Sequence, residues 1–278
     1  MRSCSRNMND IKFSVLMSLY KSESEEFLDD CFSSIYEQTL PANEITLVID
    51  GPIPNSLENV VIKWMGFLPI NVVRLEKNVG LGQALNYGVK ACSNDIIIRM
   101  DTDDICKKNR FETLVRKLDS NNKLAVVGSY IEEFVHDPGN VISIRTVPLD
   151  TESIRKDILI RNPFNHMSVA FRKKNIESVG GYVHHYFMED YNLWLRVVAS
   201  GFDVCNLNES LILARVGDNM LARRKGLKYI KSEFQLYRLK VKLGLQSHVS
   251  GFWILLVRSI PRLLPLKVLK YVYQYIRR

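Results

Sequence analysis

The chain has 278 residues, of which 46% are hydrophobic and 24% charged, so it can bury a full core and is not a disordered chain. Its length fits one large α/β domain, or one domain with an appendage. The 5 cysteines are odd in number and include no Cys-x-x-Cys pair, so neither a disulfide framework nor a zinc knuckle is indicated. Reduced cytosol is therefore the simplest compartment.

The net charge of +8 is unevenly distributed along the chain. Residues 222–278 hold fourteen Lys and Arg against a single acid, Glu233, while residues 1–221 are mildly acidic. A mildly acidic body is a poor match for nucleic acid, whereas a basic tail interleaved with aromatic and aliphatic residues suits an anionic membrane surface. No segment reaches the roughly 18 uninterrupted apolar residues of a membrane span, since the longest, residues 252–257, stops at Arg258.

Strands alternate with helices through the first hundred residues. Residues 13–20 form an apolar run that predicts a buried strand. The run is too short for a signal peptide and has no cleavage site. An amphipathic helix follows and ends before Pro41, and a second strand at residues 45–49 ends at Asp50. A third short strand is expected at residues 72–75. The alternation predicts an α/β fold with a mostly parallel sheet and helices on both faces.

Three acids, Asp101, Asp103 and Asp104, follow the apolar strand expected at residues 96–100. Acids this close repel one another, so they are best tolerated together when a cation neutralises them. Oxygen ligands of this kind suit Mg²⁺ or Mn²⁺, which carboxylates hold together with the phosphates of a substrate. The alternative is a solvated turn in which an acid caps the helix beginning near Lys107.

The carboxyl ends of parallel strands meet at one edge of a sheet, and ligands gather there. Tyr20, Asp50 and the acids at residues 101–104 are expected to converge at that edge. The glycine turn of Gly80 and Gly82 opens a helix just before the acidic strand, and N–H groups at such a helix start can cradle a phosphate. Its spacing matches neither a dinucleotide-binding loop nor a Walker loop, so its value is positional.

The parallel pattern weakens beyond the acids. A polar, proline-bent loop at residues 162–166 ends at His166. The loop position makes a functional role somewhat more plausible than for a histidine on an apolar face, but a structural or acceptor-contact role is still favoured over catalysis. The elements expected around the loop are a helix at residues 109–118, strands at 124–135 and 141–147, a helix at 150–161 and a strand at 167–171.

Two further acids, Glu189 and Asp190, begin a helix whose inward face carries Leu193, Trp194 and Val197. Acids at a helix start commonly do no more than favour the helix dipole. The functional alternative is that a carboxylate in this position, beside an apolar wall, acts as a general base toward a hydroxyl.

Six pieces of the sequence occur in a characteristic order: Ser18-Leu19-Tyr20, Ile49-Asp50-Gly51, Asn78-Val79-Gly80-Leu81 with Ala84 and Asn86, Asp101-Thr102-Asp103-Asp104, Gly180-Gly181-Tyr182, and Glu189-Asp190 with Trp194. Together they resemble the family 2 glycosyltransferases, which have the nucleotide-diphospho-sugar-binding GT-A fold with its Rossmann-like sheet. The resemblance covers roughly residues 13–220, and the joint order is more specific than any one motif. It implies a catalytic domain at residues 11–221, with a nucleotide-binding half at 11–104 and an acceptor half at 105–221.

The resemblance also implies a role for each matching acid. Asp50 is expected to bind the nucleotide base, Asp101 to lie near the ribose and the metal, and Asp103 to ligate Mn²⁺ or Mg²⁺ directly. Asp190 is expected to be the general base, with Glu189 beside it, and displacement on the far side of the sugar then inverts the anomeric centre. The other nucleotide-sugar contacts implied are Ser18, Tyr20, Gly80 and Asn86.

The sequence departs from the family pattern in two places. Family members often carry a histidine after the position of Arg215-Val216, in a loop that closes over the diphosphate; here residues 217–219 are followed by Arg223 and Arg224, which are the expected loop cations. The QxxRW motif of processive synthases is missing, so one sugar per event is expected. The expected acceptor contacts are His166 and Trp194.

Residues 222–278 show a basic, mainly helical and amphipathic pattern that Pro261 and Pro265 interrupt. In one interpretation a helix pair packs on the catalytic domain and its charges are simply solvated. In the other, this tail is an interfacial anchor on an anionic membrane, with Trp253 at headgroup depth. The anchor implies a cytoplasmic protein held peripherally on the inner face of the cytoplasmic membrane.

Resemblance to bacterial envelope-polysaccharide transferases of this size implies a polyprenyl-diphosphate-linked GlcNAc or GalNAc acceptor in O-antigen or exopolysaccharide repeat-unit synthesis. The donor is expected to be a UDP-sugar, with galactose or glucose favoured. Two alternatives come from other classes of protein. One is a nucleic-acid-binding protein acting through the basic tail, and the other is a sugar-phosphate nucleotidyltransferase, although its glycine-rich first loop is missing.

Overall fold

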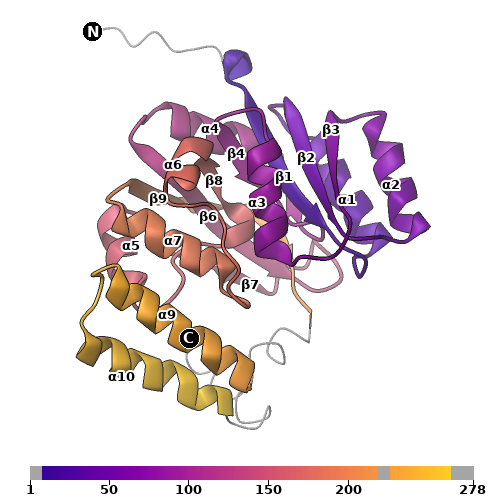
Figure 1. Cartoon of the computed structure of the whole chain (residues 1–278). Helices are drawn as coiled ribbons and strands as arrows, with labels where there is room; N and C mark the ends of the chain where they lie inside the picture. The colour runs from indigo at the N-terminus through magenta and orange to yellow at the C-terminus, as the bar shows by residue number, and fades with distance from the viewer. Residues whose placement is uncertain (1–7, 218–225, 264–278) are drawn as a thin grey trace, which may run out of the picture.

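A mixed β-sheet runs through the protein, with helices on both of its faces (Figure 1). The computed structural model describes residues 8–217 and 226–263, and within them the sheet has nine strands in the order β3-β2-β1-β4-β8-β6-β9-β5, with β7 paired to β6. The strands are β1 (Phe13–Leu19), β2 (Glu44–Asp50), β3 (Ile70–Leu75), β4 (Ile96–Arg99), β5 (Ile105–Cys106), β6 (Leu124–Phe134), β7 (Ser143–Arg145), β8 (Ala170–Arg172) and β9 (Asp203–Arg215).

The first four strands pair in parallel, with β1 between β2 and β4. β1, β2 and β4 are mostly buried because both of their faces are covered, and in β1 only Ser18 is not fully buried, whereas the edge strand β3 is partly exposed along its length. Their carboxyl ends meet at one edge of the sheet, which places Tyr20, Asp50 and Asp101 at the same end of the molecule. This half confirms the expected α/β class.

The second half adds antiparallel pairs. β8 lies antiparallel between β4 and β6, while β5 and β7 pair antiparallel with β9 and β6. β6 and β9 are parallel, with irregular register. The parallel pattern thus weakens where the sequence indicated, because β8 inserts against the direction of its neighbours.

Several element boundaries differ from the sequence expectation. The start of the strand expected at residues 167–171 belongs to a 3-10 turn, η2 (His166–Ser168), which the Ser168 hydroxyl fixes through the Asn165 carbonyl. The helix expected at residues 150–161 ends at Asp157. The carbonyls that follow it accept hydrogen bonds from distant side chains instead of helical N–H groups. The sequence did not predict α2 (Asn55–Met65), α6 (Lys173–Ser178), β5 or β9.

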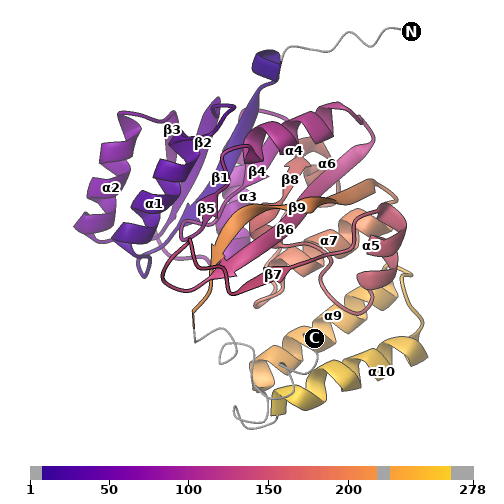
Figure 2. The same cartoon turned by 180° about the vertical axis from the view of Figure 1, so that it is seen from behind.

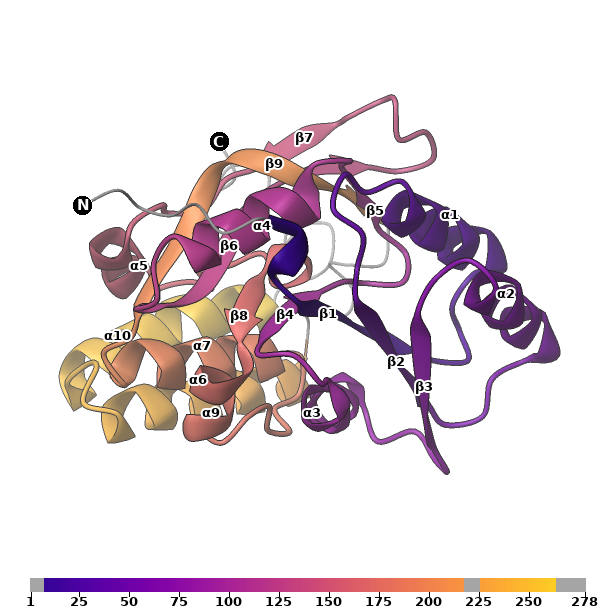
Figure 3. The same cartoon turned by 90° about the horizontal axis from the view of Figure 1, so that it is seen from above.

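Two hydrophobic clusters fill the two faces of the sheet. Figure 3 shows α4 on one side of the strands and α3, α6 and α7 on the other. The first cluster packs α1 (Glu25–Tyr36), α2 (Asn55–Met65) and α4 (Arg110–Asp119), and the second packs α3 (Leu81–Ala91), α5 (Thr151–Asp157), α6 (Lys173–Ser178) and α7 (Glu189–Ala199). A short 3-10 turn, η1 (Met8–Asp10), precedes β1.

The last described segment is a helical hairpin made of α9 (Leu227–Lys242) and α10 (His248–Ser259), followed by η3 (Ile260–Leu263). α9 adds Tyr229 and Leu236 to the cluster around α7, and α10 packs on α9. The hairpin lies at the end of the molecule toward which β1 and β4 run (Figures 1 and 2). Among residues 8–217 and 226–263, no helix combines the length and the apolar character needed to cross a bilayer.

Candidate active site

An acidic loop follows β4 at the edge where the parallel strands end. Carboxylate oxygens of Asp101, Asp103 and Asp104 lie within 4.8 Å of one another. Burial, reinforced by the charge of Asp101, raises the pKa of Asp103 to about 7. Burial and the charge of Asp103 raise the pKa of Asp104 well above its usual value. Carboxyl groups that ionise this reluctantly indicate a place for a cation, which would stabilise their charged forms.

The residues of this loop fit a hard divalent cation such as Mn²⁺ or Mg²⁺. Asp101 and Asp103 are only half-buried, and carboxylate oxygen is the ligand that these ions prefer. The buried Oδ2 atom of Asp104 has no hydrogen-bond partner among the described residues, as expected where a positive charge is to be bound close by. The three acids therefore remain the candidate metal site.

Asp104 is not a helix cap, which corrects the expectation of a turn that caps the next helix. α4 begins at Arg110 and its N-cap residue is Asn109. Asp104 is 2% exposed, and its Oδ1 accepts the backbone N–H of Arg215 at 2.9 Å. Arg215 also donates to the Asp103 carbonyl at 3.2 Å, so the end of β9 fixes the acidic loop.

Arg99, the last residue of β4, is a buried cation beside the acidic loop that sequence reasoning missed. It is 1% exposed and forms an ion pair with Asp101. Burial raises the pKa of Asp103 and that of Asp190 in α7, and the charge of Arg99 partly opposes both rises. The signal in the sequence is an arginine within an otherwise apolar strand.

The carboxylate of Asp50 holds the loop before α3. It accepts the N–H groups of Val79 at 2.7 Å and Gly80 at 3.1 Å, and the side-chain amide of Asn78 at 3.0 Å. Gly51 has a φ of +85°, and a Cβ there would lie 2.6 Å from the Asn78 nitrogen, so only glycine fits this approach. Asp50 therefore positions the glycine turn, and its expected contact with a nucleotide base stays a prediction.

The first turns of α3 pack directly on the start of α7. A Cβ added at Gly82 would lie 2.9 Å from the Cβ of Glu189, and one added at Gly181 would lie 2.3 Å from Oδ1 of Asn86. The glycine turn thus brings α3 against the acids of α7. Ser18 is half-buried in β1, and Tyr20 is exposed after it. Binding of the donor by Ser18, Tyr20, Gly80 and Asn86 stays a prediction.

Glu189 and Asp190 are the first two residues of α7. Burial and the charge of Asp190 raise the pKa of Glu189 to about 7. Burial raises the pKa of Asp190 as well, while the Tyr191 N–H and the Asn162 amide, which donates to Oδ2 at 2.6 Å, oppose the rise. A carboxylate that is hydrogen-bonded in place and tuned upward in pKa is suited to accept a proton from a hydroxyl. Asn162 was not singled out from the sequence.

His166 and Trp194 pack on each other, with ring centroids 6.2 Å apart. Nε2 of His166 and the hydroxyl of Tyr182 are 2.8 Å apart, and burial lowers the pKa of His166 well below its usual value, so the ring is neutral at pH 7. Trp194 is fully buried and packs on Phe164. Trp194 therefore supports the site from the core, which differs from the expected acceptor contact. The expected loop cations Arg223 and Arg224 lie outside the described residues.

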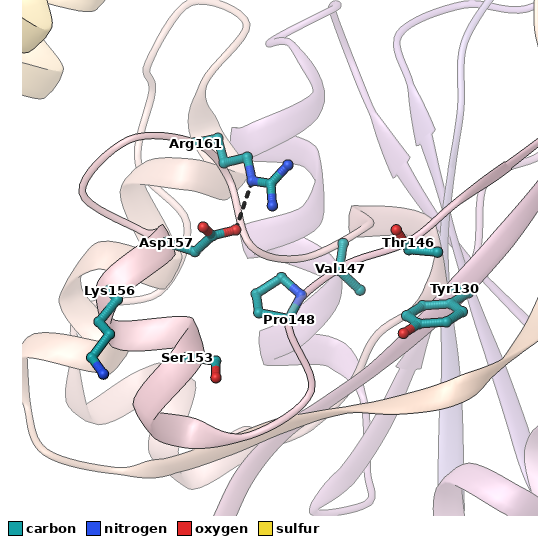
Figure 4. Close-up of a pocket in the computed structure, with 8 residues that line it drawn as sticks. All are labelled: Tyr130, Thr146, Val147, Pro148, Ser153, Lys156, Asp157 and Arg161. Atoms are coloured by element: carbon teal, nitrogen blue, oxygen red, sulfur yellow. Dashed lines mark hydrogen bonds and ion pairs between the residues drawn. The ribbon is translucent and has the colours of Figure 1, made fainter. Parts of the chain in front are cut away.

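An open groove of about 420 Å³ lies between α5 and the chain that follows β7. Figure 4 shows the ring of Tyr130 across the groove from Ser153 and Lys156, with Arg161 paired to Asp157. One lining residue, Arg161, directly precedes Asn162, whose side-chain amide donates to Asp190. The lining residues are Tyr130, Thr146, Val147, Pro148, Ser153, Lys156, Asp157 and Arg161.

A half-parallel sheet that brings an acidic loop and a helix-borne pair of carboxylates to one edge defines a glycosyltransferase of the GT-A fold. The sequence profile of "Glycosyl transferase family 2" matches residues 14–180, and the chain belongs to that family. The chain is 44% identical over 262 residues to "Amylovoran biosynthesis glycosyltransferase AmsE" of Erwinia amylovora, which covers 94% of this chain and 98% of the relative.

A second relative is the "UDP-Gal:alpha-D-GlcNAc-diphosphoundecaprenol beta-1,3-galactosyltransferase" of Escherichia coli. It is 38% identical over 271 residues, covering 96% of this chain and 97% of the relative. Among solved structures, S. aureus TarS 1-349 in complex with UDP-GlcNAc aligns with a TM-score of 0.68 at 16% identity, over 88% of this chain and 70% of that one. This structural likeness confirms the GT-A fold.

Proposed function

We propose that the protein transfers one sugar, galactose or glucose, from a UDP-sugar to a GlcNAc- or GalNAc-diphospho-polyprenyl acceptor, with inversion. The reaction would build an O-antigen or exopolysaccharide repeat unit. The observation that carries the proposal is the two-sided site, made of the acidic loop after β4, where Arg99 pairs with Asp101, and the acids that begin α7, against which the start of α3 packs. The activity named for the E. coli relative, which matches along nearly the whole chain, supports the choice of donor and acceptor.

On the donor side, Asp103 and Asp101 would hold Mn²⁺ or Mg²⁺. The ion supplies positive charge that stabilises the departing diphosphate. Arg99 keeps Asp101 oriented through their ion pair, and the Asp104 bond to the Arg215 N–H holds the loop in place. Asp50 orders the loop before α3 by accepting the N–H groups of Val79 and Gly80, so these two groups are already paired within the protein.

On the acceptor side, Asp190 is the proposed general base. Its carboxylate takes the proton of the acceptor hydroxyl while the hydroxyl oxygen bonds to the anomeric carbon of the donor. The bond from that carbon to the diphosphate breaks on the opposite face, and its electron pair leaves with UDP. An α-linked donor then gives a β-linked product. Glu189 lies beside the base. The two carboxyl groups repel each other when both are charged, so the charge of Asp190 raises the pKa of Glu189.

The groove beside Asn162 is the proposed seat of the acceptor. Tyr130 offers a ring against which a sugar face can pack, and Thr146 and Ser153 offer hydroxyl groups. Lys156 lies at the rim, where it pairs with Glu152 at 2.8 Å.

Residues 222–278 are the proposed membrane-associating tail, beside a catalytic domain at residues 11–221. Exposed basic side chains line one face of α9, and exposed apolar side chains line the face of α10 turned away from α9. This pairing of an apolar stripe with cations suits a bilayer interface that carries anionic lipids. The basic residues are Lys228, Lys231, Arg238 and Lys242, and the apolar stripe consists of Val249, Phe252, Trp253 and Val257 of α10 and of Ile260, which follows it.

The test is a donor screen by UDP release, with Mn²⁺ and a synthetic GlcNAc-diphospholipid acceptor. We expect acceptor-dependent release from one UDP-hexose, and a β-linkage in the product by NMR. Absence of acceptor-dependent UDP release from every UDP-sugar would contradict the proposal. Release of diphosphate from a nucleoside triphosphate and a sugar phosphate would instead indicate a nucleotidyltransferase.

A further inference from the structure

Three consecutive carbonyl groups after α5 are fixed by side chains from distant parts of the chain. The carbonyl of Ile158 accepts the Tyr191 hydroxyl at 2.7 Å, and the carbonyl of Leu159 accepts Nζ of Lys240 at 2.7 Å. The carbonyl of Ile160 accepts Nη1 of Arg258. Two of the three donors thus come from the α9–α10 hairpin, and together they define the shape of the turn at residues 158–162.

This turn ends at the residue that holds the base. Asn162 donates to Oδ2 of Asp190 at 2.6 Å, and Tyr191 is the next residue after Asp190. Nζ of Lys240 also donates to the Tyr191 hydroxyl at 3.1 Å, and both Lys240 and Arg258 lie against the Tyr191 ring. The hairpin therefore contacts the surroundings of Asp190 by two routes, one through the turn and one through Tyr191.

Burying the cations of the hairpin costs free energy, so packing alone does not explain why they are there. Lys240 is 2% exposed, and burial with the charge of Arg258 lowers its pKa to about 7. Arg258 is held by Glu233, itself 2% exposed, through bonds of 2.6 and 2.9 Å. Apolar residues of similar volume would fill the same space without desolvating charge. What the cations add is donors at fixed points, each matched to a carbonyl that has no helical partner.

We propose that Lys240 and Arg258 are positioning residues, through which the α9–α10 hairpin sets the turn at residues 158–162 and hence the orientation of Asp190. The inference rests on the proposed role of Asp190 as general base. It makes the hairpin part of the catalytic apparatus, in addition to any contact that the hairpin makes with a membrane.

The test combines Lys240→Met with Asn162→Ala and uses Tyr237→Phe as the matched control. Tyr237→Phe also removes one hydrogen bond of the hairpin, the 3.1 Å bond to His248, but this bond lies within the hairpin. We expect Lys240→Met to lower kcat about 10-fold while KM for the UDP-sugar changes less than about 2-fold, because misorientation of a base affects the chemical step. Tyr237→Phe should keep the wild-type kcat.

The double variant separates positioning from general stability. If Lys240 acts through Asn162, then Lys240→Met should cost little in an Asn162→Ala background, whereas independent effects would multiply. Multiplying effects, or a wild-type kcat in Lys240→Met, would overturn the inference. If the wild-type enzyme transfers no sugar at all, the proposed function is wrong, and the result does not bear on the positioning of Asp190.

Hydrogen exchange provides a measurement that does not depend on activity. Lys240→Met should raise amide exchange at residues 158–162 and 189–192, and leave β1 and β2 as slow as in the wild type and in Tyr237→Phe. Unchanged exchange at those two segments would overturn the inference. Should Lys240→Met fail to fold, Arg258→Lys serves in its place, because it keeps a cation beside Glu233 and removes the bond to Ile160. The same exchange pattern is expected for it.

Discussion

Asn162 donates its side-chain amide to Oδ2 of Asp190 over 2.6 Å, so the proposed base is held by a residue from outside its own helix. The bond stabilises the charged carboxylate and opposes the rise that burial imposes on the pKa of Asp190. This one contact therefore affects both the orientation and the proton affinity of the base.

Removing this amide should shift the pH dependence of transfer. In Asn162→Ala the pKa of Asp190 rises further, so the carboxylate is protonated up to a higher pH and the acid limb of kcat moves to higher pH. The loss of rate is therefore larger at pH 6 than at pH 9. A pH profile of kcat measures the shift, with the exposed Asn140→Ala as control. An acid limb that stays in place would contradict the contact as a tuning device.

Replacing the base itself should abolish transfer without loss of donor binding. Asp190→Asn keeps the size of the side chain and removes its ability to take a proton, so kcat should fall about 100-fold or more. The affinity for UDP, measured by calorimetry, should stay at the wild-type value. Glu189→Gln is the matched control beside it and should retain more activity. An active Asp190→Asn enzyme would refute the assignment.

Metal removal should act through the acidic loop. We expect EDTA to abolish UDP release and Mn²⁺ or Mg²⁺ to restore it. The acids at residues 101–104 are negative, so without a cation they cannot stabilise a departing diphosphate, which is also negative. Asp103→Asn should weaken Mn²⁺ binding, measured by calorimetry with UDP present. Full activity in EDTA would show that the loop works without a metal.

The membrane proposal predicts that α10 contributes to vesicle binding. Trp253→Ser combined with Val257→Ser removes two side chains that are 64% and 69% exposed, so binding to vesicles containing anionic lipid should weaken, as measured by flotation. Ile62→Ser is the control, since Ile62 is 59% exposed but lies on α2. If the α10 double variant binds vesicles as well as Ile62→Ser does, the membrane contact does not involve this face of α10.

Gly51 should be far less tolerant of substitution than a glycine of similar conformation. In Gly51→Ala the new Cβ meets the Asn78 nitrogen at 2.6 Å in addition to the strain of a φ of +85°. Gly201, with a φ of +81° and nothing within 4 Å, isolates the strain, which costs about 1 kcal/mol. Urea unfolding should show a larger loss of stability for Gly51→Ala than for Gly201→Ala.

The acids of the site could be found from the sequence because each lies at the end of a regular element. Asp101 follows an apolar strand and Asp190 begins an amphipathic helix, and both features are readable within about ten residues. The parallel half of the sheet was predictable for the same reason. The alternative of a helix cap is wrong for Asp104, and the sequence could not exclude it, because the partner of Asp104, the Arg215 N–H, lies more than a hundred residues away.

The residues that support the acids could not be predicted from the sequence, for a related reason. Asn162 lies in an irregular loop, and nothing local marks its amide as the partner of Asp190. Lys240 looks like any cation of an amphipathic helix, although the fold buries it against a carbonyl. Periodicity indicates which face of an element is apolar, but not which polar group a distant element will bring to it.

The bonds from Lys240 and Arg258 to the turn after α5 limit how the protein can be recombined with its relatives. Exchanging everything beyond residue 226 for the corresponding piece of another family member looks like a simple way to change membrane preference. Such a chimera, however, would pair one parent's hairpin with the other parent's turn at residues 158–162. Crossovers should therefore inherit both segments from the same parent, even though they lie far apart in the sequence.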